Sequence, residues 1–383
     1  MPFSFSAAPL QFRKARYLIM KRTLRLLSVL LALCLILTAC GSTESSEESP
    51  GRTITDSCGR TVTVPDQVER IVPLGNAPRL VAYLGLADKV AAVPQCEHTD
   101  NPLMAYAYVN RALWQDLPNV GNDSLGAGEW YAEEILATGA DVVICTYDAD
   151  TADDIQSQTG IPTVAVASPA LFSEDYNDAL RLVAQVCGAE ERAEALIACI
   201  QDSLADLEAR TADIPDAEKP LVLGAGATFK GSHSIDGVYA NYPVFQVLSA
   251  RDAALGISDT VGGLLVDREQ ILAWDPDILF FDASSVELVQ TDYAADPAFF
   301  QQLKAVHTGQ LYQWPNSTWH STNVEIPLVS AYWVGQLLYP DAFADVDIEE
   351  KASEIFGLFL GQADYLDTLN ASGYGYQAVE LGA

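Results

Sequence analysis

The chain has 383 residues, of which 52 are acidic and 21 are lysine or arginine, so its formal net charge is −31. Such an acidic chain repels nucleic acid and anionic membranes, which argues against a nucleic-acid role. The charge does not exclude any class of small ligand, because a local pocket can have either sign. The length allows two domains of ordinary size, each with its own core.

The N-terminal segment differs from the rest of the chain. Residues 1–39 hold six basic side chains and no acid, and they end in the apolar run LLSVLLALCLILTA. This pattern predicts an export signal, with Met1 or Met20 as its start, whereas a plain transmembrane anchor needs a longer apolar segment. The end of the run, Leu-Thr-Ala-Cys, resembles the lipobox of bacterial lipoproteins. We therefore expect a signal peptide over 1–39, then the lipidated Cys40 and a flexible tether over 40–51.

Five further cysteines follow Cys40, and none of them forms a CxxC pair. Export permits disulfides, but an odd number of thiols cannot all pair within one molecule. Cys145 lies in an apolar run and Cys199 on the apolar side of a predicted helix, so we expect both to pack in the core. The sequence leaves disulfide pairing open.

The first part of the mature chain alternates strand and helix patterns. β-rich runs on both sides of Cys58-Gly59-Arg60 predict a hairpin with its turn at Gly59. The further predicted elements are strands over 68–75, 89–94 and 160–166 and a helix over 77–84 that ends at Gly85. A strand, a helix and a strand at this spacing form a βαβ unit, which predicts a parallel sheet.

Residues 173–213 contain no strand pattern. Ser173 is placed to cap a helix that runs to Cys187. A second helix of 22 residues is predicted from Ala189 to Arg210, and at about 1.5 Å per residue it reaches about 33 Å, the width of a small domain. We expect this helix to connect two bodies and to restrict hinge bending between them.

The α/β pattern resumes after Pro215 and contains a repeat. Strands are predicted over 221–226 and 310–314, and helices over 243–250, 323–338 and 347–360. The helix-strand unit EEILATGADVVI at 133–144 returns as EQILAWDPDILF at 269–280, 136 residues later. One unit used twice indicates two lobes with approximate two-fold symmetry.

Taken in order, the export signal, the two α/β lobes, the long helix and the repeated unit resemble the helical-backbone substrate-binding proteins of ABC importers for ferric siderophores, vitamin B12 and haem. Both copies of the unit are similar to the family element E-x-I-L-A-x-x-P-D-x-V-I, although Ala140 stands where proline is usual. The resemblance implies two three-layer α/β lobes with mainly parallel central sheets joined by a single long α-helix, as in class III periplasmic binding proteins. We expect an N-terminal lobe over 52–172, a helical segment over 173–214 and a C-terminal lobe over 215–383.

The resemblance also implies a function. It predicts a monomeric lipoprotein without enzymatic activity or cofactor, anchored through Cys40 on the outer face of the membrane. Its ligand would be a ferric siderophore or related iron chelate, with haem, cobalamin or an oxyanion as alternatives. Its partner would be a permease dimer with its ATPase, docked by Glu133 and Glu269, which occupy matching places in the two repeats. A function of another class, an exported metal-dependent enzyme or ligand sensor, stays open.

Ligands of open α/β sheets bind outside the carboxyl ends of the strands, which selects the loops that follow them. These loops carry cationic and aromatic side chains, which suit the anionic oxygens and partly apolar body of an iron chelate. The candidate ligand-binding residues are Arg79, Trp130 and Tyr147 in the first lobe and Lys230, His233, Tyr239, Trp319 and His320 in the second. For any one of them alone, a capped loop or a rim position explains the sequence better than a ligand contact does.

Motifs for other chemistry are missing from the sequence. The four histidines show no HExxH or other compact ligand spacing, so a sequence-local zinc site is not predicted. The stretch GAGATFKGS lacks the order of a phosphate-binding loop, and the chain has no GxSxG element of serine hydrolases. We therefore predict neither a metal site nor a catalytic residue.

Overall fold

The structure is a computed structural model that describes residues 51–123, 128–168, 170–318 and 323–382. The predicted signal peptide, Cys40 and most of the tether lie outside these residues, as do Trp319 and His320. Residues from Gly51 onward form one compact unit. In the described part of the chain, no helix is long and apolar enough to cross a membrane.

The N-terminal lobe is built on a short parallel sheet. The predicted hairpin is present as β1 (Arg52–Thr55) and β2 (Thr61–Val64), and Gly59 adopts φ +78° in its turn. The sheet has the order β3-β6-β7, with β3 (Ile71–Leu74), β6 (Val142–Cys145) and β7 (Thr163–Ala165) all parallel. The other elements are α2 (Ala77–Tyr83), α3 (Ala105–Trp114), β4 (Gly121–Asn122), β5 (Glu129–Trp130), α4 (Ala132–Ala137) and α5 (Ala149–Thr159).

The predicted strand over 89–94 is wrong. Residues Ala87–Lys89 form one 3-10 turn, and the segment after them makes only isolated bridges, Val90 with Ile71 and Val93 with Asn119. Its backbone donors go to different partners, because Ala91 N–H bonds to β3 while Val93 N–H bonds to the carbonyl of Pro118. The segment therefore crosses from the edge of the sheet to a loop instead of extending a strand.

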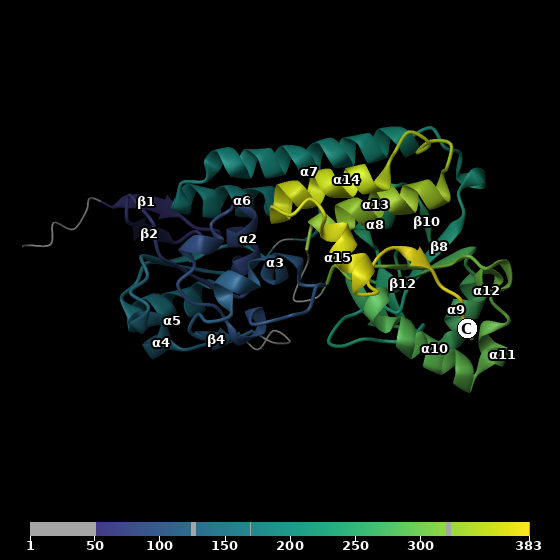
Figure 1. The fold of residues 1–383 in the computed structure, drawn as a ribbon, viewed down its shortest axis with the longest axis horizontal. Coiled ribbons are helices and arrows are strands. Elements are labelled where there is room, and N and C mark those ends of the chain that lie inside the picture. Colours follow the sequence, from purple (N-terminus) through teal and green to yellow (C-terminus); the bar gives the residue numbers. More distant parts are fainter. Residues whose placement is uncertain (1–50, 124–127, 169, 319–322, 383) are drawn as a thin grey trace, which may run out of the picture. The chain divides into compact units, whose positions relative to one another are not determined.

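Two helices follow the N-terminal lobe. They are α6 (Glu174–Cys187) and α7 (Glu190–Thr211), which has 22 residues as predicted. Ser173 occupies the N-cap position of α6, but its hydroxyl donates to the carbonyl of Ala170 and makes no cap bond to the helix. Leu196, Ile200 and Leu207 of α7 are buried, which accounts for the apolar spacing in the sequence. Helix α7 packs against α6 at its start and against α13 and α14 further along (Figure 1).

The C-terminal lobe is built on a mixed sheet. Its central strands β8 (Leu221–Ala225), β12 (Ile278–Asp282) and β13 (Leu311–Trp314) are parallel, and β10 (Arg251–Asp252) pairs parallel with β8. Antiparallel strands flank them in the order β11-β9-β8-β12-β13-β14, with β9 (Gly237–Ala240), β11 (Gly262–Leu265) and β14 (Gln377–Ala378). The helices are α8 (Pro243–Val247), α9 (Arg268–Trp274), α10 (Val286–Ala295), α11 (Pro297–Phe300), α12 (Lys304–Thr308), α13 (Glu325–Leu338), α14 (Ile348–Leu360) and α15 (Tyr365–Ala371).

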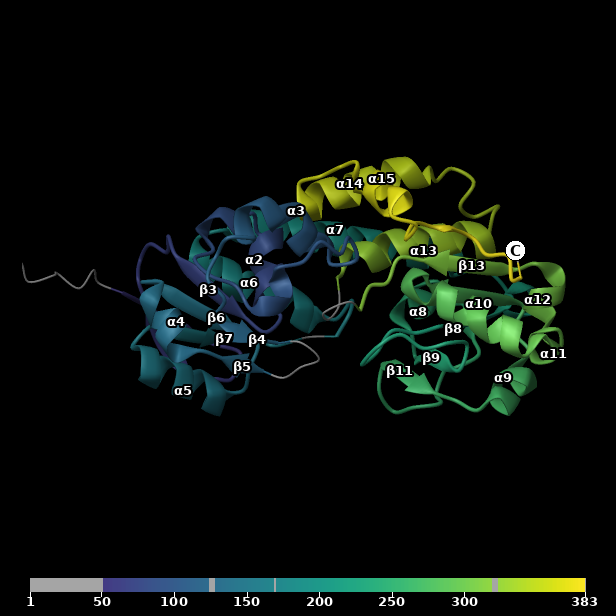
Figure 2. The ribbon, with the colours of Figure 1, turned by 60° about the horizontal axis from the view of Figure 1, so that its bottom comes forward.

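Each sheet has helices on both faces, as the three-layer prediction requires (Figure 2). On one face of each sheet lies a separate apolar cluster, one containing Val143 and Ile155, the other Phe281 and Phe300. The opposite faces of both sheets contribute to one continuous core, which also contains buried residues of α2, α6, α7, α13 and α14. The two lobes are therefore connected by α7 and also by a shared apolar layer.

Candidate functional site

The carboxyl ends of β8, β12 and β13 meet around one buried carboxylate. Asp282, the last residue of β12, is 1% exposed and accepts four hydrogen bonds. Its Oδ1 accepts from Trp314 Nε1 at 2.9 Å, and its Oδ2 accepts from Thr228 N at 2.8 Å, Tyr239 Oη at 2.7 Å and Asn316 Nδ2 at 3.2 Å. Burial raises the pKa of Asp282 to about 6, although these donors favour the ionised form.

A second buried polar side chain, Asn316, links the same loops. Its Nδ2 donates to Thr228 Oγ1 at 2.6 Å and to Ser284 Oγ at 2.7 Å, and its Oδ1 accepts from Ser284 N at 3.1 Å. Thr318 Oγ1 adds a bond to the carbonyl of Thr228 at 2.8 Å. The loops after β8, β12 and β13, which sequence reasoning selected for ligand contact, thus form one hydrogen-bonded group.

The loop after β8 carries two of the predicted ligand-binding residues. Lys230 is exposed and adopts φ +50°, a left-handed conformation that is uncommon for a residue with a side chain. His233 is partly buried, stacks on Phe229 with ring centroids 4.1 Å apart, and donates from Nε2 to the Phe229 carbonyl at 2.9 Å. An exposed cationic side chain therefore follows directly after Phe229 of the aromatic stack.

Tyr239 is buried, whereas a side chain that contacts a ligand needs an accessible surface. It is 2% exposed, its ring stacks on Tyr242 with centroids 4.7 Å apart, and its hydroxyl donates to Asp282. Desolvation raises the pKa of Tyr239, so the hydroxyl stays a donor. Its observed contacts are structural, and its ligand contact stays a prediction.

The N-terminal lobe has its own buried carboxylate at the loops after β3 and β6. Asp123 is 5% exposed and accepts from Gly75 N at 2.9 Å and from the hydroxyl of Tyr147. Desolvation raises the pKa of both Asp123 and Tyr147. The loop after β3 is also bonded to the end of β6, because Asn76 N–H donates to Thr146 Oγ1 at 2.8 Å.

The remaining predicted residues of this lobe have different degrees of burial. Trp130 and Tyr147 are partly buried and pack against the same apolar cluster. Arg79 is 3% exposed, lies over the ring of Tyr106 at 5.3 Å, and donates from Nε to Asn323 Oδ1 at 3.2 Å. Arg79 thus joins α2 of one lobe to the segment before α13 of the other, and its ligand contact stays a prediction.

The same junction contains a buried glutamate. Glu325 is completely buried at the start of α13 and accepts a hydrogen bond from the hydroxyl of Tyr83 in α2. Burial raises the pKa of Glu325 to about 7, even though the Tyr83 bond and Arg79 favour its ionised form. This contact adds a second side-chain link between the lobes.

Glu133 and Glu269 lie at matching places on the surface. Each is exposed in the first turn of its helix, Glu133 in α4 and Glu269 in α9. The helix and the following strand of each copy are formed as the repeat predicted, with α4 before β6 and α9 before β12. The two carboxylates are therefore accessible to a partner.

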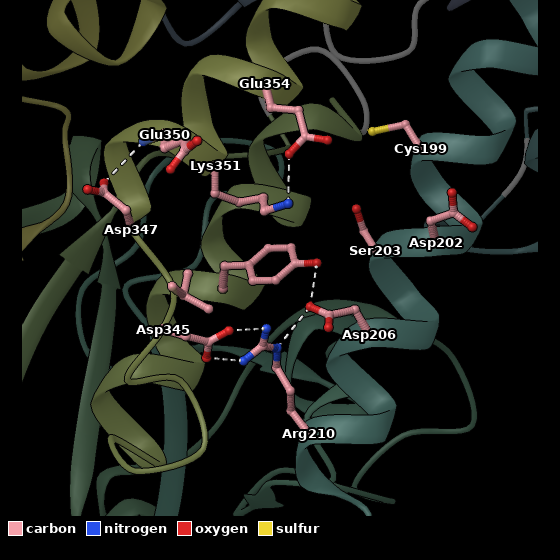
Figure 3. A pocket seen from close by; sticks show the side chains of 12 residues that line it. Cys199, Asp202, Ser203, Asp206, Arg210, Asp345, Asp347, Glu350, Lys351 and Glu354 are labelled. Atoms are coloured by element: carbon pink, nitrogen blue, oxygen red, sulfur yellow. Dashed lines mark hydrogen bonds and ion pairs between the residues drawn. The ribbon is translucent and has the colours of Figure 1, made fainter.

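A cavity of about 450 Å³ lies elsewhere, between α7, α13, α14 and the segment before α14. Six of its lining side chains are acidic and two are basic, and the close view shows both basic side chains paired with acids (Figure 3). Arg210 binds Asp345 and Asp206, and Lys351 binds Glu354. This acidic lining disfavours an anionic chelate, so the cavity does not compete with the strand ends as its site.

Sequence reasoning missed the residues that organise the strand ends. Asp282, Asp123 and Asn316 were not singled out, although an acid that ends the apolar run ILFFD was visible in the sequence. An acid at the end of a strand is compatible with a solvent-exposed turn, so the run alone does not reveal four bonded donors.

Comparison with known proteins agrees with this architecture. Residues 75–318 match the sequence model of the family described as "Periplasmic binding protein". The Fe(3+)-citrate-binding protein YfmC of Bacillus subtilis is 26% identical, with 78% of this chain and 91% of YfmC covered, and the molybdate-binding protein MolA of Haemophilus influenzae is 24% identical, with 80% and 90% covered. A periplasmic solute-binding protein of Veillonella parvula has the same fold, with a TM-score of 0.67, 22% identity and coverage of 84% of this chain and 98% of that one.

Proposed function

Since the chain belongs to the periplasmic binding protein family and is thus a substrate-binding protein of an ABC importer, we propose that its cargo is a ferric siderophore or a related iron chelate. The ligand would lie between the lobes, at the carboxyl ends of their parallel strands. The protein would then deliver it to a permease without changing it chemically.

The observation that carries this proposal is the exposed Lys230 beside the Phe229–His233 stack, in a loop anchored at the end of β8. An ammonium group binds the anionic donor oxygens of a ferric chelate, and an aromatic pair suits its apolar part. The Fe(3+)-citrate-binding relative supports the same class of ligand. Trp130 and Tyr147 would contribute contacts from the N-terminal lobe. Arg79 and Tyr239 also remain candidates, although both are buried. Trp319 and His320 are candidates that lie outside the described residues.

A binding panel tests the cargo. Purified protein is titrated with ferric citrate, a ferric hydroxamate, a ferric catecholate, haem, cobalamin and molybdate while tryptophan fluorescence is recorded. We expect saturable quenching by at least one ferric chelate. Saturation by molybdate alone would instead support an oxyanion, which the molybdate-binding relative makes the second candidate, and saturation by none would refute both.

We further propose that Glu133 and Glu269 dock the permease, one lobe on each half of a permease dimer. Both are exposed, and both lie in the first turn of the repeated helix. The double variant Glu133→Ala with Glu269→Ala should abolish uptake in cells and leave ligand affinity unchanged. The matched control changes the next residue of each helix, Glu134→Ala with Gln270→Ala, which are also exposed. Normal uptake by the first double variant would remove the docking assignment.

The lipid anchor on Cys40 is part of the same proposal and rests on the lipobox-like sequence before it. It would hold a monomeric receptor near its permease on the outer face of the membrane. Cell fractionation tests it directly, because Cys40→Ala should move the protein from the membrane fraction to the soluble exported fraction. Retention of that variant in the membrane would contradict a lipid anchor.

A further inference from the structure

Asp282 connects all three loops that follow the central strands of the C-terminal sheet. Its four donors come from the loop after β8, from β9, from the end of β13 and from the loop after β13. The side chain is only 1% exposed, and both of its oxygens are used. A carboxylate buried in this way acts on the loops that it bonds, because a ligand in the solvent-facing loops has almost no access to it.

Asn316 adds a second buried link between the same loops. It is fully buried and bonds to the loop after β8 through Thr228 and to the loop after β12 through Ser284. Lys230, two residues after Thr228 in the chain, is exposed in its left-handed conformation. The position of the exposed ammonium group therefore depends on buried bonds at Thr228.

The N-terminal lobe has one corresponding hydrogen bond at the matching place. The repeat offset of 136 residues puts Thr146 at the position of Asp282. Thr146 accepts the N–H of Asn76 from the loop after β3, as Asp282 accepts the N–H of Thr228 from the loop after β8. Each of these two loops begins with a glycine at positive φ, +64° and +60°. In each lobe, the residue two positions after the repeated unit is thus an acceptor for an N–H of the neighbouring strand's loop.

We propose that Asp282 is a positioning residue for ligand capture, which fixes the three loops before the ligand arrives and does not touch it. A loop that is already ordered loses less conformational entropy on binding, so affinity rises without any new contact. This inference rests on the proposed function, because it takes these loops as the ones that hold the chelate.

The test compares Asp282→Asn with a matched control at the other end of the same strands. Asparagine keeps the size of the side chain but replaces one acceptor oxygen by a donor, so at least one of the bonded N–H or O–H groups loses its partner. In the control, Asp277→Asn, the altered carboxylate accepts from the N–H of Leu221 at the amino end of β8 and pairs with Lys304. Both variants disturb an end of strand β12, but only the end at Asp282 adjoins the proposed ligand loops.

Two measurements separate positioning from general destabilisation. We expect Asp282→Asn to bind ferric citrate, or the ferric chelate that saturates the wild type, at least tenfold more weakly. We also expect trypsin to cut the unliganded variant faster after Lys230, the exposed lysine of the loop. Asp277→Asn should lose thermal stability without either change. If Asp282→Asn does not fold, the same measurements are made on Asn316→Ala. This variant removes one of the four donors to Asp282 and leaves the carboxylate in place.

The outcomes distinguish this inference from the proposed function. If the wild type binds a chelate and folded Asp282→Asn binds it equally well, positioning by Asp282 is wrong. It is also wrong if Asp277→Asn weakens binding as much at the same loss of stability. If the wild type binds no ferric chelate, the proposed cargo is wrong. The rate of tryptic cleavage after Lys230 then still decides whether Asp282 orders the loop.

Discussion

The buried carboxyl group of Glu325 is expected to make the protein less stable as pH rises, and Glu325→Gln should remove this effect. Glu325 is fully buried in the junction between α2 and α13, where one oxygen accepts from Tyr83. In the described residues, its other oxygen, Oε1, has no hydrogen-bond partner. An ionised carboxylate with an unmatched oxygen is costly to bury, so the folded state favours the protonated form.

The magnitude follows from the pKa of the group in the two states. Burial raises the pKa of Glu325 from 4.5 to about 7. Below pH 4.5 the carboxyl is protonated in both states, and it destabilises neither. As pH rises, the unfolded chain releases the proton first, so the folded state loses stability until pH passes 7. A pKa difference of about 2.5 corresponds to about 3 kcal/mol in all, of which about 2 to 3 kcal/mol falls between pH 5 and pH 8.

The assay is urea unfolding at pH 5 and pH 8, followed by tryptophan fluorescence, for the wild type and Glu325→Gln. Any fixed effect of the amide cancels when the change between the two pH values is compared. The free energy of unfolding of the variant, relative to the wild type, should rise by about 2 to 3 kcal/mol from pH 5 to pH 8. An exposed glutamate of α14, Glu349→Gln, is the control and should follow the wild type. A difference between variant and wild type that stays constant with pH would refute the reasoning.

Two further changes test the loop and the core. Lys230→Gln removes an exposed charge, so it should weaken binding of an anionic ferric chelate about tenfold, measured by fluorescence titration, and leave the melting temperature unchanged; unchanged affinity would exclude Lys230 from the site. Gly335→Ala places a methyl group against the buried ring of Phe343, whose Cε2 would lie 2.8 Å from the added Cβ. Overpacking of this kind should lower the free energy of unfolding by about 1 to 3 kcal/mol in urea unfolding, although alanine alone favours a helix; a more stable variant would contradict the packing.

The elements that could be predicted from the sequence are those with a local pattern. Helix α7 was expected over 189–210 and is found at Glu190–Thr211, because its apolar side chains repeat with the helical period and it packs on one face. The two copies of the repeated unit were also found as predicted. The strands β9, β11 and β14 were not predicted, since they are short and depend on partners distant in the chain, such as Tyr312 for Ala378.

The candidate site was predictable only as a set of loops. Strand ends can be located from the sequence, and they select the loops around Lys230 and Tyr147. The sequence does not show which of their polar side chains face solvent. Arg79 looked like a cationic ligand contact, yet it is buried against Tyr106 and bonded to Asn323, 244 residues away. Such long-range pairings decide burial, and no local pattern encodes them.

The junction between the lobes bears on how far they can move. The long helix led to the expectation of modest lobe movement, and the structure adds contacts that act in the same direction. Tyr83 bonds Glu325, Tyr365 Oη donates to the carbonyl of Pro102 at 2.6 Å, and Tyr83 packs edge-on against Phe359 at 5.2 Å. All of these contacts are buried and belong to the shared apolar layer or border it. A wide rotation would expose that layer and leave buried polar groups unpaired, whereas a small adjustment of the loops at the strand ends keeps both intact. Ligand capture by this protein should therefore depend more on how well those loops are ordered beforehand than on the swing of the lobes.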